Sequence, residues 1–198
     1  TLTVASSWFE NNTATCPNTT TACSSWGGAV AAVEAPAVNL VGNDFSRNAV
    51  DLERIAVNDS ASRAAGGGGC VSVMYNADVS GSRVFIDGNA FRGCLVRMAG
   101  SNTKNGASGV QYGNTYGGAV SLYYGFRAAS SLQVRDVTAS FTNNLCDSAV
   151  ISARVGTGGN AYGGCLSVYA GAWSVHVTGG SSFGSVLVDG MRVNISGN

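Results

Sequence analysis

Two short motifs alternate along the whole chain and constrain its fold more than any other feature. A glycine motif, Gly-Gly-(Ala/Cys)-(Val/Leu), occupies residues 27–30, 68–71, 117–120 and 163–166. A phenylalanine motif, Phe-x-x-Asn with variants, occupies residues 9–12, 45–48, 91–94, 141–144 and 195–198. Motifs that recur about every 20 to 25 residues are typical of solenoids, in which each repeat stacks on the one before it. We therefore expect one coil for each motif.

The segments between the motifs alternate in hydropathy as β-strands do. Val38-Asn39-Leu40 and Val84-Phe85-Ile86 precede phenylalanine motifs, and Val71-Ser72-Val73 follows a glycine motif. Such period-two patterns predict strands with one buried face. A β-sandwich would need tight hairpin turns such as Asn-Gly, and Asn105-Gly106 is the one Asn-Gly pair in the chain. We therefore predict an all-β chain folded as a parallel β-helix of roughly eight to nine coils, a rod of about 40 Å at the usual strand spacing.

Composition excludes several classes of protein. Charged residues are 11% of the chain and its net charge is zero, whereas a nucleic-acid-binding surface needs a basic excess. No apolar run of 18 residues predicts a membrane span, and the first residues do not resemble a signal peptide. Six cysteines accompany four N-glycosylation sequons, at Asn11, Asn18, Asn58 and Asn194. This combination predicts a secreted, extracellular protein that carries N-linked glycans.

The alternating motifs resemble those of a known repeat family. GGA(I/L/V) and FxxN tetrapeptides are the signature of the chlamydial polymorphic membrane proteins, which are surface-exposed autotransporter adhesins with a predicted β-helical passenger. Similar repeats are found in cysteine-bearing extracellular proteins of green algae, and Cys70, Cys94 and Cys165, which stand inside motifs, look more like the algal type. The resemblance implies a right-handed parallel β-helix with an adhesive or structural role. It covers residues 1–198 as a single domain, which we expect to be a segment of a longer chain.

Each motif residue has a predicted structural role. The aromatic residues of the phenylalanine motif are expected to point inward and stack, namely Phe9, Phe45, Phe91 and Phe141. The asparagines are expected to be turn residues that tolerate a left-handed backbone and whose amides bond to neighbouring coils, namely Asn12, Asn48 and Asn144. The alternative is a row of asparagines that contacts a glycan or a metal. The paired glycines are expected to form a tight corner where two backbones approach each other.

The register of the repeat pairs the cysteines. Cys16 lies near Cys23 in a polar loop, whereas Cys70 and Cys94, and likewise Cys146 and Cys165, lie one motif apart. We predict these three disulfides, the last two joining adjacent coils. Zinc is the alternative ligand, but the chain has one histidine and no C-x-x-C. We therefore predict no metal and no other cofactor.

Catalysis and ligand binding remain as alternatives to a purely structural role. Pectate lyases and polygalacturonases share the β-helix, but the acids of this chain are scattered, and Asp87 and Asp189 are similar in register yet four motifs apart. Exposed aromatics are a possible sugar-binding platform, namely Tyr112, Tyr116, Tyr123, Tyr124, Tyr162 and Tyr169. We predict a non-catalytic structural or adhesive module of a cell-surface, matrix or appendage-fibre protein. Its expected partners are N-linked glycans and other domains or subunits of a surface assembly or filament. The alternative is a carbohydrate-binding β-helix or a pectate-lyase-like enzyme.

Overall fold

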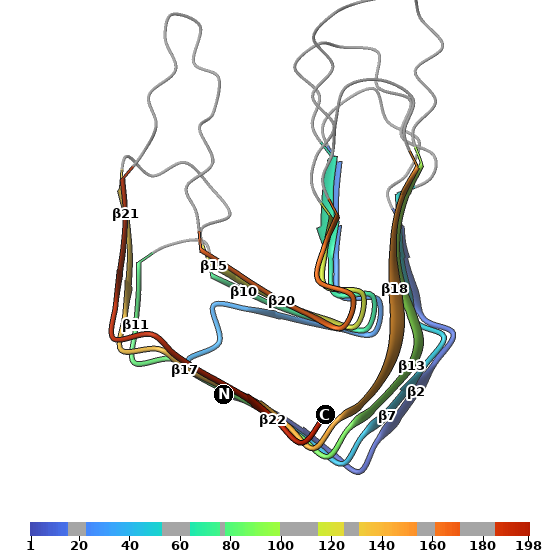
Figure 1. Ribbon diagram of the computed structural model, residues 1–198, viewed down its shortest axis with the longest axis horizontal. Coiled ribbons are helices and arrows are strands. Elements are labelled where there is room, and N and C mark those ends of the chain that lie inside the picture. The colour runs from blue at the N-terminus through green and yellow to red at the C-terminus, as the bar shows by residue number, and fades with distance from the viewer. Residues whose placement is uncertain are drawn as a thin grey trace, which may run out of the picture.

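The computed structural model describes residues 1–15, 23–52, 64–75, 78–99, 115–124, 131–153, 161–170 and 185–198. Within these ranges every regular element is a β-strand, there is no helix, and all strand pairs are parallel. The chain is therefore all-β, as the alternating hydropathy predicts. Figure 1 shows the strands bundled into flat layers that curl around a common centre.

The strands form five parallel sheets, which we name A to E. Sheet A contains β1 (Leu2–Ala5), β6 (Ala37–Val41), β12 (Arg83–Asp87), β17 (Thr138–Thr142) and β22 (Arg192–Ser196). Sheet B contains β2 (Trp8–Glu10), β3 (Thr13–Thr15), β7 (Asp44–Ser46), β8 (Ala49–Asp51), β13 (Ala90–Ala99) and β18 (Leu145–Ala153). Sheet C contains β4 (Cys23–Trp26), β9 (Ala64–Gly67), β14 (Thr115–Tyr116) and β19 (Ala161–Tyr162). Sheet D contains β5 (Val30–Val33), β10 (Val71–Tyr75), β15 (Val120–Tyr124) and β20 (Leu166–Ala170), and sheet E contains β11 (Val79–Ser80), β16 (Ser131–Arg135) and β21 (Ser185–Asp189).

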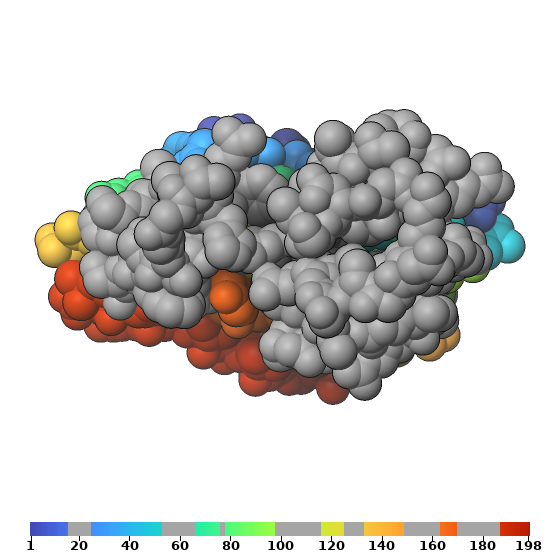
Figure 2. Space-filling view, turned by 90° about the horizontal axis from the view of Figure 1, so that it is seen from above, coloured from blue at the N-terminus to red at the C-terminus, as the bar shows by residue number. Residues whose placement is uncertain are grey.

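The chain visits the sheets in a fixed order and then returns to sheet A beside its previous strand. We call one such passage a circuit, and we call positions that pair across successive circuits a station. Equivalent stations are 36, 46, 55 and 54 residues apart. The first circuit is the shortest: it passes from β5 directly to β6 without a strand in sheet E, and its connection from β3 to β4 is shorter than the connection from β8 to β9. Figure 2 shows the circuits in order, from blue N-terminal residues at one margin to red C-terminal residues at the opposite margin.

Each circuit contains both kinds of motif, so the predicted count of eight to nine coils is wrong. The glycine motif occurs once per circuit, because Val71 pairs with Val30 and with Val120, and Val120 pairs with Leu166. Sheet A accordingly has five strands and spans about 19 Å rather than 40 Å at the usual strand spacing. One motif per coil was the wrong period, because the two motifs mark different corners of the same circuit.

Alternation along the strands of sheet A separates the core from solvent. Val38 and Leu40 are fully buried, whereas Asn39 between them is not. Val84 and Ile86 repeat this arrangement in the next circuit, where Phe85 points outward and is 41% exposed. The inward residues join one core cluster with apolar residues of sheets B, D and E. Burial of these columns stabilises the stack by about 1.5–3 kcal/mol for each large side chain.

Two glycines in each glycine motif serve different purposes at the corner between sheets C and D. The first glycine has a left-handed backbone, with φ of +64° at Gly27 and +63° at Gly68. The second lies where two backbones approach, because a Cβ atom at Gly69 would stand 2.3 Å from the carbonyl oxygen of Gly118. A Cβ at Gly28 would likewise stand 2.1 Å from the carbonyl oxygen of Gly69. Only glycine fits both requirements without strain or clash.

Candidate functional site

Asparagine side chains connect every circuit at the corner between sheets A and B. At this station the side-chain Oδ1 of each asparagine accepts a hydrogen bond from the backbone N–H of the residue at the same station in the preceding circuit. The four bonds run from Ser7 to Asn43, from Asn43 to Asn89, from Asn89 to Asn144 and from Asn144 to Asn198, at 3.0, 2.9, 3.0 and 2.9 Å. We call this set of residues the main ladder. Its middle members are almost fully buried, so the amides satisfy backbone donors that water does not reach.

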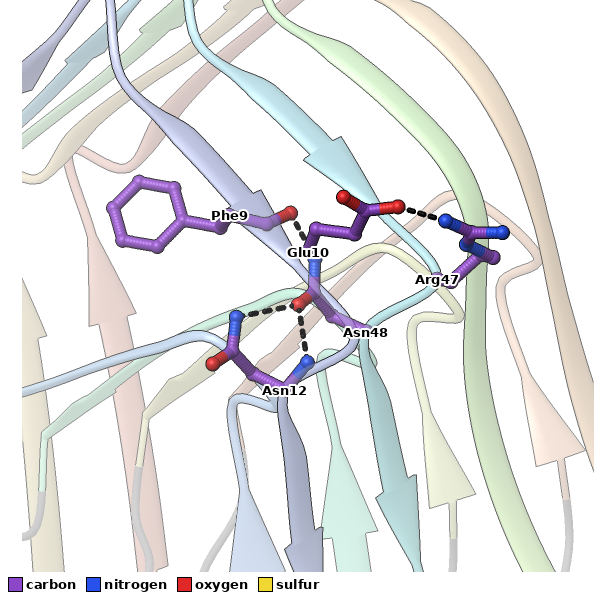
Figure 3. A network of polar contacts seen from close by, with 5 residues as sticks. All are labelled: Phe9, Glu10, Asn12, Arg47 and Asn48. Carbon is purple, nitrogen blue, oxygen red and sulfur yellow. Dashed lines mark hydrogen bonds and ion pairs between the residues drawn. The ribbon is translucent and has the colours of Figure 1, made fainter.

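A second, shorter ladder lies within sheet B. The backbone N–H of Asn12 and its Nδ2 both donate to Oδ1 of Asn48, at 3.0 and 2.9 Å, and Nδ2 of Asn48 donates to the carbonyl oxygen of Phe9 (Figure 3). An ion pair between Glu10 and Arg47 lies beside it. The ladder stops at the third circuit because Cys94 occupies the station of Asn48. The predicted contact of asparagine amides with neighbouring coils therefore describes both ladders.

Asn144 does not lie at the station of Asn12 and Asn48, contrary to the sequence-based grouping. It belongs to the main ladder, and Phe141 before it pairs with Ile86 in sheet A. The residue that pairs with Phe91 is Cys146. Phe-x-x-Asn fits both corners, because an apolar inward residue precedes a ladder asparagine by three positions at each of them. The main-ladder residues Asn43 and Asn89 were missed, although Val-Gly-Asn at 41–43 and Asp-Gly-Asn at 87–89 carried a signal.

The left-handed residue at these corners is the one before the ladder asparagine. Asn11 has φ of +55° and precedes Asn12, and Asn143 has φ of +53° and precedes Asn144. Arg47, with φ of +54°, holds the same place before Asn48. The expectation that the motif asparagines themselves take a left-handed backbone is therefore wrong. Their role is to bridge circuits with their side chains.

The aromatic rings form a continuous column in the core. The centroids of Phe9 and Phe45 are 4.9 Å apart, those of Phe45 and Phe91 are 5.1 Å apart, and both pairs are nearly parallel. Phe141 extends the column from the neighbouring sheet A, with its centroid 6.1 Å from that of Phe91. It fills the layer in which Cys146 replaces a phenylalanine. Phe9 lies at the end of the column and is only partly buried.

Two disulfides connect sheet B with the glycine corner. Cys70 is bonded to Cys94, and Cys146 is bonded to Cys165, across sequence separations of 24 and 19 residues. These are the pairs that the repeat register predicts. Because one circuit spans 36 to 55 residues, each bond crosses part of a circuit instead of joining equivalent stations of adjacent coils. The predicted partners Cys16 and Cys23 are not described as a pair, since Cys16 lies outside the described residues and Cys23 is described only through its backbone.

Three ion pairs join successive circuits on the outer surface of sheet B. Besides Glu10 and Arg47, they link Asp44 with Arg92 and Asp51 with Arg97. The partners are at least partly exposed, so each pair contributes about 0–1 kcal/mol. On sheet A, Asp87 accepts hydrogen bonds from Thr142 and Asn143, at 2.6 and 2.9 Å. The charged side chains of both sheets therefore bridge neighbouring strands.

The expected similarity of Asp87 and Asp189 is wrong, because Asp87 ends β12 in sheet A and Asp189 ends β21 in sheet E. Within the described ranges, no three residues of the types His, Cys, Asp and Glu gather closely enough to hold a metal ion. These ranges also contain no helix with the length and apolar character needed to cross a membrane.

The tyrosines predicted to be exposed are mostly core residues. Tyr116, Tyr123 and Tyr124 are fully buried, whereas Tyr169 is half-buried and stacks on Tyr123. Tyr116 and Tyr162 pair in register, but Tyr112 and the side chain of Tyr162 lie outside the described residues. The prediction that these tyrosines form an exposed sugar-binding surface is therefore wrong for the three buried rings. Alternation did not reveal this, because strands β10 and β15 of sheet D are buried on both faces: their second face packs against sheet C.

Burial changes the acidity of one tyrosine pair. The rings of Tyr75 and Tyr124 stack at 5.0 Å, and the Tyr75 hydroxyl donates to the carbonyl oxygen of Ala35 at 2.6 Å. Desolvation raises the pKa of Tyr124 far above its ordinary value, and the neighbouring Tyr75 raises it further. Desolvation also raises the pKa of Tyr75. Both hydroxyls therefore stay protonated at neutral pH.

Two of the four predicted glycosylation sites are described, and both are exposed. Asn11 lies at the corner between β2 and β3, and Asn194 lies in the middle of β22. Asn18 and Asn58 lie outside the described residues. Comparison of the chain with models of protein families, with curated proteins and with solved structures gave no significant match.

Proposed function

We propose that the chain is a right-handed parallel β-helix that serves as a non-catalytic structural or adhesive module of a secreted, N-glycosylated cell-surface, matrix or appendage-fibre protein. The observation that carries this proposal is the main ladder. It connects all five layers at one station with bonds of nearly constant length, although the circuits differ by up to 19 residues in the spacing of ladder partners, from 36 to 55. A stack that tolerates such insertions while keeping its ladder suits a rigid support for variable loops.

The chemistry of the polar side chains supports a structural role. The asparagine row, which could have contacted a glycan or a metal, uses its amide groups on backbone N–H and C=O groups inside the protein. The ion pairs connect neighbouring circuits on the surface. Two disulfides suit an oxidising, extracellular environment. Two exposed sequon asparagines are accessible to the glycosylation that we propose.

The test compares structural integrity with catalysis. The chain, secreted from a eukaryotic host, is incubated with pectins and other acidic polysaccharides, with and without calcium, and the reducing or unsaturated ends are counted. We expect no turnover and proteolytic resistance of the strand segments. A matched variant, Asp87→Ala, should have the same lack of turnover and nearly the same stability, because the hydrogen bonds of Asp87 are exposed or only partly buried. Turnover that disappears in Asp87→Ala or in another single aspartate variant would contradict the proposal and favour the enzyme.

A further inference from the structure

One outward station of sheet A contains both a sequon and an exposed aromatic ring. Its five members, in circuit order, are Thr3, Asn39, Phe85, Ser140 and Asn194. Phe85 is 41% exposed, whereas the other four members of its station are polar. Asn194 is the acceptor of the sequon Asn194-Ile195-Ser196. The sequon and the ring thus share one face of one sheet.

Alternation fixes the direction in which a glycan leaves Asn194. Ile195 continues the inward column of Phe141, so Asn194 and Ser196 lie on the outward face of β22. Ser140 is the member that lies between Asn194 and Phe85. Two strand spacings, about 10 Å, therefore separate the backbone of Asn194 from that of Phe85, with only a small side chain between them.

We propose that the N-linked glycan of Asn194 folds back along this station, with its first N-acetylglucosamine over Ser140 and its second against the ring of Phe85. This inference rests on the extracellular, N-glycosylated function proposed above. The core of an N-glycan begins with two such sugars in line, and this arrangement matches the two strand spacings. The apolar C–H face of a pyranose covers the exposed ring and removes apolar area from water.

The neighbouring stations suit the polar edges of the sugars. Arg83, Thr138 and Arg192 follow one side of the column, and all three are exposed. Thr142 and Ser196 follow the other side. Hydroxyl and acetamido groups of the two sugars therefore face side chains that donate and accept hydrogen bonds. The glycan would cover the outer face of sheet A in the last three circuits and exclude a protein partner from it.

Nuclear magnetic resonance of the glycan tests the proposal directly. The chain is secreted from a eukaryotic host with the other three sequons removed, and its single glycan is labelled with ¹³C. We expect ring protons of the second N-acetylglucosamine to shift upfield because they lie over an aromatic face. The shift should be lost in Phe85→Ser, which copies the neighbouring Ser140, and retained in Trp8→Ser, which removes an exposed ring from sheet B.

The result separates this inference from the function on which it rests. Intact mass before and after glycosidase treatment, with Ser196→Ala as the unglycosylated control, shows whether Asn194 carries a glycan. An unmodified Asn194 would contradict both the glycosylated function and the present inference. A glycan whose second sugar has the same chemical shifts in Phe85→Ser as in the unchanged chain would overturn the inference alone.

Discussion

Replacing one main-ladder asparagine should destabilise the whole stack, and Asn89 is the most informative position. It is 1% exposed and lies in the middle of the ladder. Its Oδ1 accepts from the backbone N–H and from Nδ2 of Asn43, at 2.9 and 2.8 Å. Its Nδ2 donates to the carbonyl oxygens of Leu40 and Asp87 and to Oδ1 of Asn144. The substitution Asn89→Ala removes these contacts at once.

The magnitude follows from the donors that lose their acceptor. The backbone N–H of Asn43 loses its acceptor, and so does one of the two N–H groups of the Asn43 amide, whose nitrogen keeps its bond to the carbonyl oxygen of Val4. Each buried donor without an acceptor costs about 1–3 kcal/mol. We therefore expect Asn89→Ala to lower the free energy of unfolding by about 4 kcal/mol. Urea titration followed by circular dichroism measures the change, and hydrogen exchange at the Asn43 amide should accelerate.

The matched control is Asn12→Ala at the exposed start of the shorter ladder. The side chain of Asn12 donates one hydrogen bond to Oδ1 of Asn48. In Asn12→Ala, this oxygen would still accept the hydrogen bond from the backbone N–H of residue 12. Because no buried group loses its only partner, we expect a loss of about 1 kcal/mol or less. Equal losses in Asn12→Ala and Asn89→Ala, or unchanged exchange at Asn43, would refute the view that the buried amides hold the circuits together.

Three further predictions concern the corner, the core and the tyrosines. Gly69→Ala places a Cβ 2.3 Å from a backbone oxygen and should cost more than about 4 kcal/mol in urea unfolding, whereas Gly164→Ala, which meets no atom within 4 Å, should be nearly neutral. Phe91→Ala should cost about 3–5 kcal/mol in the same assay, and Phe85→Ala on the unglycosylated surface about 0.5 kcal/mol or less. Because folding raises the pKa of Tyr124, this tyrosine loses its hydroxyl proton at lower pH in the unfolded chain than in the folded chain, so the free energy of unfolding should fall as the pH rises above 10.0. Unfolding at about pH 9 and about pH 11 should show a smaller fall for Tyr124→Phe than for the unchanged chain.

The sequence was sufficient where a physical requirement falls on one residue type. Val38 and Leu40 flank Asn39 with the period of a strand, and their burial follows that period. The glycine motif aligns in register in all four circuits, because its first glycine has a left-handed backbone in each of them, and at Gly28 and Gly69 the second glycine lies against another backbone. Both features are local, so the sequence pattern identifies them without knowledge of the neighbouring circuits.

The sequence was insufficient where two stations impose the same requirement. Phe45-x-x-Asn48 and Phe141-x-x-Asn144 each place an apolar residue inward, a left-handed residue before the asparagine, and an amide toward the next circuit. They lie in different sheets, and only the pairing of Phe141 with Ile86 separates them. Treating them as one station misplaced Asn144, whereas counting each glycine motif and each phenylalanine motif as a coil halved the apparent period and doubled the predicted number of coils. Spacing alone cannot resolve two corners that use the same chemistry.

The inward and outward stations of sheet A indicate where function can vary. The inward station of Val38 contains only small or medium apolar residues, Leu2, Val38, Val84, Ala139 and Val193, because each side chain packs against its neighbours in the stack. The outward station beside it holds a threonine, an aromatic ring, a serine and two asparagines. Packing does not restrict the size of the side chains at this outward station, so substitutions there change the free energy of unfolding only slightly. Recognition and modification are therefore expected on the outward stations, which is the reason that Phe85 and Asn194, rather than the ladder asparagines, are the residues on which to test for a bound glycan.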